Sequence, residues 1–146
     1  MKQRIKVIGI TGGIASGKST IAEMLESLGA DLIDADKICH ELINTKDIAL
    51  EITKRWGNHL KNNHGKIKRE ELAEIVFSDR KEVSALNRII HPKAIKQIRS
   101  RIAKLHVEAA TKAIVLDAAL LVESNLIDIC DIVLFVNTEK DRCKTR

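Results

Sequence analysis

Short apolar runs alternate with amphipathic stretches along the chain. Residues 5–11 form a short run rich in β-branched side chains that ends at glycines, whereas residues 18–28 place apolar side chains three and four positions apart. The first pattern is typical of a buried strand and the second of a helix. Gly29 stands where a glycine commonly ends a helix. The beginning of the chain is therefore predicted to form a strand, a glycine loop and a helix.

The same alternation continues further along the chain. The sequence DLID at 31–34 predicts a second strand, and residues 35–42 predict a helix. Continuous apolar runs at 113–117 and 132–136 are typical of parallel strands that helices cover on both faces. A last helix is predicted to begin at Thr138. This alternation predicts an α/β protein with a parallel sheet.

The stretch 45–111 has a different character. Helical patterns break at 56–57 and again at 62–65, and no strand pattern occurs between them. We interpret this stretch as a helical insertion within one domain that covers residues 1–146.

Two helix starts are predicted inside this insertion. Asp79 and Glu82 have the spacing of a capping box, in which each side chain bonds to the backbone of the first turn. Pro92, which follows His91, suits the first turn of a second and longer helix.

Composition and charge narrow the class of protein. The chain has 146 residues, of which 45% are apolar and 31% charged, and a formal net charge of +5. These values predict a folded soluble protein, and no apolar stretch is long enough to cross a membrane. With 2% aromatic residues, the chain offers few side chains for stacking on nucleic acid. The three cysteines lack metal-binding spacing, which favours a reducing cytoplasm.

The glycine loop matches the pattern G-x-x-x-x-G-K-[ST] of a phosphate-binding loop. Such a loop turns its backbone N–H groups and the positive end of the following helix toward a nucleotide's phosphates. Lys18 would add a positive charge, and the Ser19 hydroxyl would ligate Mg²⁺. A simple glycine turn before a helix leaves Lys18 and Ser19 unexplained. The candidate nucleotide-binding residues are Gly12, Gly13, Ile14, Ala15, Ser16, Gly17, Lys18, Ser19 and Thr20.

Three carboxylates follow predicted strands, where ligands of open α/β sheets bind. Asp34 and Asp36 come at the end of the second strand, and Asp117 ends the strand at 113–117. One of the first two could deprotonate an attacking hydroxyl while the other holds water or Mg²⁺. Either could instead cap the next helix. Asp117 could likewise be a nucleotide-site acid or a cap, and the spacing leaves both choices open.

A run of basic residues follows Pro92. It is either a solvated helix face or a contact for an anionic substrate. The run consists of Lys93, Lys96, Arg99, Arg101 and Lys104.

Four segments together resemble the dephospho-coenzyme A kinase family. They are GITGGIASGKST, LIDADKI, LNRIIHP and LDAALLVE, and their order and spacing agree with the family. The resemblance implies a three-layer P-loop fold of the nucleoside-monophosphate-kinase type, in which the helical insertion binds substrate. It also implies ATP-dependent phosphorylation of the ribose 3′-hydroxyl of dephospho-coenzyme A, which gives coenzyme A and ADP, with Mg²⁺.

The resemblance also implies roles for individual residues. Asp36 matches the catalytic base, while Asp34 would contact substrate and Mg²⁺. Arg142 and Arg146 match the arginines that lead into a lid and stabilise the transferring phosphoryl group. The other residues implied in substrate binding are His91, Asp117 and Leu120.

The sequence departs from the family at several points. Ala15 replaces a usual glycine, and Ala119 and Val122 replace a usual proline and phenylalanine. Family members continue past Arg146, so we expect the C-terminal part, with the rest of the lid, to be missing here. Two alternatives stay open: a small P-loop kinase of a nucleoside or shikimate-like alcohol, and an inactive nucleotide-binding fragment. The sequence gives no indication of the oligomeric state.

Overall fold

The computed structural model describes residues 4–13, 16–108, 110–119, 121 and 124–137. The chain divides into two compact units. The first consists of Met1–Asp36 and Gln97–Arg146, and the second of Lys37–Lys96. The two units are described separately below.

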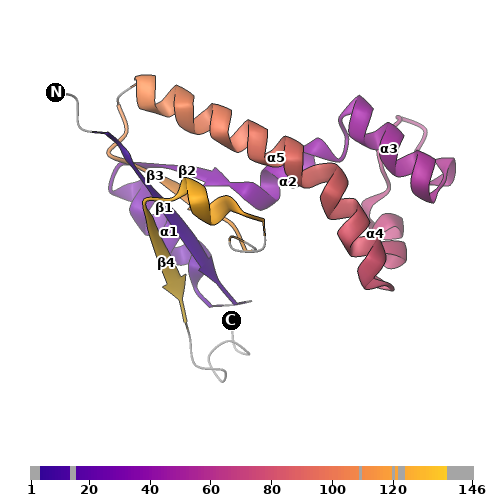
Figure 1. Cartoon of the computed structure of the whole chain (residues 1–146), viewed down its shortest axis with the longest axis horizontal. Helices are drawn as coiled ribbons and strands as arrows, with labels where there is room; N and C mark the ends of the chain where they lie inside the picture. Colours follow the sequence, from indigo (N-terminus) through magenta and orange to yellow (C-terminus); the bar gives the residue numbers. More distant parts are fainter. Residues whose placement is uncertain (1–3, 14–15, 109, 120, 122–123, 138–146) are drawn as a thin grey trace. The chain divides into compact units, whose positions relative to one another are not determined.

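The first unit contains a parallel sheet (Figure 1). Its strands are β1 (Lys6–Gly12), β2 (Ala30–Asp34), β3 (Ala113–Asp117) and β4 (Ile132–Val136), in the spatial order β2-β3-β1-β4. Every pairing is parallel, so the carboxyl ends of the strands meet at one edge. The parallel α/β fold predicted from the sequence is confirmed, and the predicted strands agree with the observed ones to within one residue.

Both faces of the sheet are covered. On one face, helix α1 (Lys18–Ser27) buries Ala22 against Ile10 of β1 and Val115 of β3. On the other face, a Cβ atom added to Gly9 would lie 2.6 Å from the Sγ atom of Cys130. The chain that follows β3 therefore packs directly on the backbone of β1, and only glycine fits there. Burial raises the pKa of the Cys130 thiol to about 11, because desolvation disfavours the thiolate.

The prediction that both faces are covered holds for the apolar run at 113–117 but is wrong for the one at 132–136, which forms β4. In β3, Ile114, Val115 and Leu116 are fully buried. In β4, by contrast, Leu134 is 38% exposed and Phe135 is 70% exposed. Within the described part of the chain, β4 pairs with β1 alone and lies at the edge of the sheet. An apolar run predicts a strand but does not distinguish a central position from an edge position.

The second unit is built from helices. They are α2 (Ala35–Leu42), which begins at the end of the first unit, α3 (Lys46–Trp56), the short 3₁₀ helix η1 (Asn58–Leu60), α4 (Arg69–Phe77) and the first part of α5 (Arg80–Glu108). Helix α3 ends at Trp56, where the sequence predicts a break. The unit spans 37–96, and the assignment of residues 45–111 as a substrate-binding insertion stays a prediction.

Helix α5 corrects the predicted helix start at Pro92. It runs without interruption from Arg80 to Glu108, with Pro92 in its interior. Proline removes one backbone N–H donor there and normally weakens a helix. Ile90 and Ala94 on either side of it are buried, and burial of this kind can outweigh a local propensity.

The predicted capping box before α5 is half right. The Asp79 Oδ1 atom accepts a hydrogen bond from the Lys81 backbone N–H at 2.9 Å, as a cap does. The Glu82 side chain does not return to the backbone. It accepts hydrogen bonds from Arg55 Nε and Nη2, both at 3.1 Å, and from Trp56 Nε1 at 2.6 Å. Glu82 therefore ties the end of α3 to the beginning of α5.

Candidate active site

The glycine loop connects β1 to α1 at the carboxyl edge of the sheet. Gly17 precedes α1 with a φ of 91°, in the left-handed region that glycine adopts without strain. The Ser16 backbone N–H donates a hydrogen bond to the Gly13 carbonyl at 3.2 Å, and Ser16 is buried. Ser16 and Gly17 therefore lead directly into the first turn of α1, where backbone N–H groups have no partner within the helix.

The two glycines at the end of β1 differ in their surroundings. A Cβ atom at Gly12 would lie 2.5 Å from the Val136 carbonyl oxygen and 2.9 Å from Ser16 Oγ. A Cβ atom at Gly13 would have no neighbour within 4 Å. Position 12 therefore requires glycine, because the end of β4 lies too close for a side chain. At position 13 the described fold leaves space for one.

Lys18 forms an ion pair with Asp117. The Lys18 Nζ atom lies 2.5 Å from Asp117 Oδ1, and the two side chains are 15% and 13% exposed. Lys18 is the first residue of α1 and Asp117 the last residue of β3, 99 positions later. The lysine that the loop pattern assigns to phosphate binding thus has a carboxylate as its partner in this structure.

The candidate carboxylates gather at the same edge. Asp34 and Asp117 are register partners in the β2–β3 pairing, and Asp117 is the partner of Ile10 in β1. Asp36 lies in the first turn of α2, directly after β2. The sheet therefore brings Asp34, Asp36 and Asp117 to the edge that carries the phosphate loop.

The two residues predicted to bind Mg²⁺, Ser19 and Asp34, both carry oxygen donor atoms. Ser19 is exposed in the first turn of α1, and Asp34 ends β2. Among the described residues, no group of three or more histidine, cysteine or acidic side chains could hold a metal ion. Mg²⁺ in phosphoryl-transfer sites takes one or two protein oxygens, together with water and substrate phosphates. One hydroxyl and one carboxylate fit that requirement.

The described structure does not assign the other predicted site residues to this edge. Ile14, Ala15, Leu120, Arg142 and Arg146 are outside the described residues. Thr20 is exposed on α1. His91 lies on α5 within the second unit, and partial burial lowers the pKa of its imidazole because desolvation disfavours the charged form. The roles given to these residues stay predictions.

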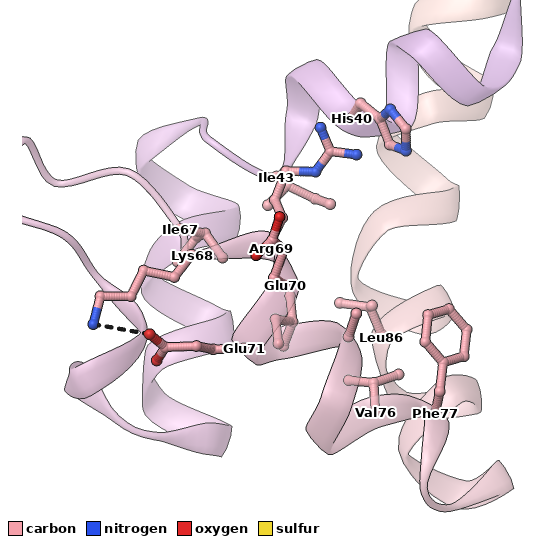
Figure 2. A pocket seen from close by; sticks show the side chains of 12 residues that line it. His40, Ile43, Ile67, Lys68, Arg69, Glu70, Glu71, Val76, Phe77 and Leu86 are labelled. Carbon is pink, nitrogen blue, oxygen red and sulfur yellow. Dashed lines mark ion pairs between the residues drawn. The ribbon is translucent and has the colours of Figure 1, made fainter.

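The second unit contains a cavity that the sequence did not predict (Figure 2). Its volume is about 920 Å³. His40 and Arg69 lie close together at one end, and Val76, Phe77 and Leu86 lie at the other. An ion pair of 3.2 Å joins Lys68 to Glu71. The remaining lining residues are Ile43, Ile67, Glu70, Leu72 and Ala73.

No sequence motif marks this cavity, because α2, α4 and α5 each supply part of its wall. The one available signal is the mixture of charged and apolar residues at 67–77.

In the described part of the chain, no helix is long and apolar enough to cross a membrane.

The parallel sheet, together with a phosphate loop between a central strand and the next helix, defines a protein of the P-loop NTPase-like class. Residues 6–146 match the family model described as dephospho-CoA kinase. The chain belongs to the dephospho-CoA kinase family, which is a family of kinases.

Individual relatives agree with this assignment. The chain is 40% identical to a dephospho-CoA kinase of Fusobacterium nucleatum over 132 residues, which cover 90% of this chain and 66% of that protein. It is 36% identical to one of Dehalococcoides mccartyi over 94% of this chain and 69% of the relative. The chain therefore spans about two thirds of the length of these relatives.

Solved structures show the same fold. A crystal structure from Thermus thermophilus matches with a TM-score of 0.78 and 27% identity, over 97% of this chain and 70% of that one. A dephospho-CoA kinase from Campylobacter jejuni matches with a TM-score of 0.67 and 25% identity, over 96% of this chain and 94% of that one.

Proposed function

We propose that the chain transfers the γ-phosphoryl group of ATP to the ribose 3′-hydroxyl of dephospho-coenzyme A, giving coenzyme A and ADP. Membership of the family supports this reaction. The observation that carries it is the convergence of Lys18, Asp34 and Asp117 at one edge of the sheet, beside the phosphate loop.

The loop and the first turn of α1 would bind the phosphates of ATP. Their backbone N–H groups and the positive end of the helix favour an anion. Lys18 stands at the first position of that helix and would contact the β- and γ-phosphates. Tight binding at these groups holds the γ-phosphorus in place for attack.

Asp36 would act as the general base. Its carboxylate accepts the proton of the 3′-hydroxyl while that oxygen bonds to the γ-phosphorus, and the bond from phosphorus to the bridging oxygen breaks to release ADP. Asp34 would orient the hydroxyl from the end of β2. Arg142 and Arg146 would neutralise charge that develops on the phosphoryl group.

Ser19 and Asp34 would hold Mg²⁺, which when bound supplies positive charge to the phosphates. The exposed Ser19 hydroxyl is one donor, and the carboxylate at the end of β2 is the other.

The second unit would bind part of the acceptor, with His91 among its contacts, and Asp117 and Leu120 of the first unit would be further substrate contacts. A cavity of about 920 Å³ falls in the size range of small-molecule sites. Arg69 and His40 at one end suit phosphate groups, and the apolar end formed by Val76 and Leu86 suits an uncharged arm. Dephospho-coenzyme A combines both kinds of group.

A coupled assay of ADP release tests this proposal. The 146-residue chain is given ATP and Mg²⁺ with dephospho-coenzyme A, with a nucleoside, with shikimate, or with no acceptor. We expect ADP release with dephospho-coenzyme A well above the other three arms. Faster release with the nucleoside or shikimate would assign another acceptor, and equal release in all arms would contradict a kinase of this substrate.

An Arg69→Ala variant tests the cavity in the same assay. It should raise the KM for dephospho-coenzyme A and leave the KM for ATP unchanged. Lys68→Ala is the matched control, because Lys68 is the neighbouring cation and is already paired with Glu71. An unchanged KM for the acceptor in Arg69→Ala would exclude this cavity from acceptor binding.

A further inference from the structure

The ion pair between Lys18 and Asp117 joins the phosphate-binding lysine to a carboxylate of the same edge. Both side chains are mostly buried, and the Nζ and Oδ1 atoms lie 2.5 Å apart. A lysine in this position cannot give its full charge to a phosphate while the carboxylate holds it. Phosphate and carboxylate are both anions, so they compete for the same ammonium group.

The strand register fixes this competition in place. Asp117 lies between Ile10 of β1 and Asp34 of β2, as the register partner of both. The strand that ends at Asp117 is therefore held between two neighbouring strands. Lys18 has four side-chain carbons and can turn its ammonium group away from Asp117 more easily than the strand can move.

We propose that Asp117 is the resting partner of Lys18, and that an arriving nucleotide phosphate takes Lys18 from it. This inference rests on the proposed nucleotide site but concerns a separate step, the exchange of one anion for another. Phosphate can then bind fully only after the ion pair has broken. The apparent affinity for phosphate is therefore the intrinsic affinity multiplied by the fraction of molecules in which Lys18 is not paired with Asp117.

The exchange has a second consequence. When Lys18 moves to the phosphate, the Asp117 carboxylate loses its cation at the moment the nucleotide is in place. A carboxylate released in this way can accept a hydrogen bond from a hydroxyl group of the acceptor. Asp117 therefore becomes available to the acceptor only after the nucleotide has bound.

Replacement of Asp117 by asparagine tests the exchange without any need for turnover. Asn keeps the size of the side chain and removes its charge. Calorimetric titration with ADP, in the absence of Mg²⁺, should show binding about fivefold tighter than in the parent. ADP no longer has to break the ion pair in the variant, and a factor of this size is typical of a partly buried pair. Inorganic phosphate should show a gain in the same direction.

Two controls separate this exchange from a general effect of charge. Asp31→Asn removes the same charge at the exposed beginning of β2, and its affinity for ADP should stay within about twofold of the parent. In a Lys18→Ala background, Asp117→Asn should give no gain. Equal or weaker binding of ADP by a folded Asp117→Asn variant would overturn the proposal.

A measurement on the unsubstituted chain covers the case in which the variant does not fold. Carbon-13 NMR of the Asp117 carboxyl carbon should show its resonance move when ADP saturates the site, because the ammonium group leaves it. A resonance that does not move would overturn the proposal. Failure of ADP to bind the parent at all would instead contradict the proposed nucleotide site.

Discussion

Asp34 and Asp117 are register partners at the carboxyl ends of two neighbouring strands, β2 and β3. Partners in a parallel sheet point to the same face. Val115 of β3 packs against α1, and Asp117, two positions later, shares that face with Lys18. The sheet therefore offers two carboxylates to one side of the phosphate loop, and one of them is already paired with the loop's lysine.

Replacement of Lys18 by alanine should weaken ATP binding by about 100-fold or more, because the loop's backbone N–H groups cannot replace a positive charge at the phosphates. The fold should persist, since Lys18 is not part of the apolar core around Ala22. Titration with a non-hydrolysable ATP analogue measures the affinity, and circular dichroism checks the fold. Parent-like binding in Lys18→Ala would refute the assignment of the loop.

An Asp36→Asn variant should lower the rate of phosphoryl transfer by about 100-fold or more, with nearly normal ATP affinity, because an amide cannot accept the hydroxyl proton. Single-turnover kinetics with dephospho-coenzyme A measure this rate. Asp34→Asn is the matched variant at the end of β2. Equal losses in both would leave the base unassigned, and an unaffected rate in Asp36→Asn would exclude Asp36.

Gly12 and Gly13 offer a paired test of the loop's packing. Gly12→Ala should destabilise the chain by about 1–3 kcal/mol, because its Cβ atom would collide with the Val136 carbonyl oxygen. Gly13→Ala should melt like the parent, because its Cβ atom would meet no neighbour within 4 Å. Thermal unfolding followed by circular dichroism measures both. Equal melting of the two variants would show that β4 does not constrain Gly12.

The local part of the site could be predicted from the sequence. The phosphate-loop pattern from Gly12 to Ser19 is a single continuous segment of sequence, so it can be recognised without knowledge of the fold. Strand β3 was predicted with its observed bounds from a continuous apolar run, and its three central side chains are fully buried. Local pattern and tertiary environment agree in both cases.

The parts that failed depend on contacts between distant residues. The pairing of Lys18 with Asp117 crosses 99 positions, and it exists because β3 lies beside β1. No local sequence pattern predicts the spatial order of the strands. Pro92 predicts a helix start because helix propensity depends on neighbouring residues alone. The burial of Ile90 and Ala94 in the continuous helix depends on contacts with residues distant in the sequence. Glu82 had the spacing of a capping residue but found stronger partners on α3.

The Glu82 cluster predicts a pH-dependent stability of the second unit. Hydrogen bonds from Arg55 and then from Trp56 hold the pKa of the Glu82 carboxyl below its ordinary value of 4.5. The folded chain therefore binds the proton less readily than the unfolded chain. The stabilisation is fully present above about pH 4.5 and is lost as the pH falls through the lower, folded value. Its size is small, because the ion pair is partly exposed to solvent.

Trp56 is the single tryptophan of the chain and donates its indole N–H to Glu82, so its fluorescence reports on this cluster directly. Glu82→Gln should lower the melting temperature slightly at pH 7. Between pH 5 and about pH 3, its fluorescence should change less than that of the parent, because glutamine has no proton to gain. Glu51→Gln, on the exposed side of α3, is the control and should follow the parent. A Glu82→Gln variant with the parent's acid transition would show that the Glu82 carboxylate does not stabilise the junction of α3 and α5.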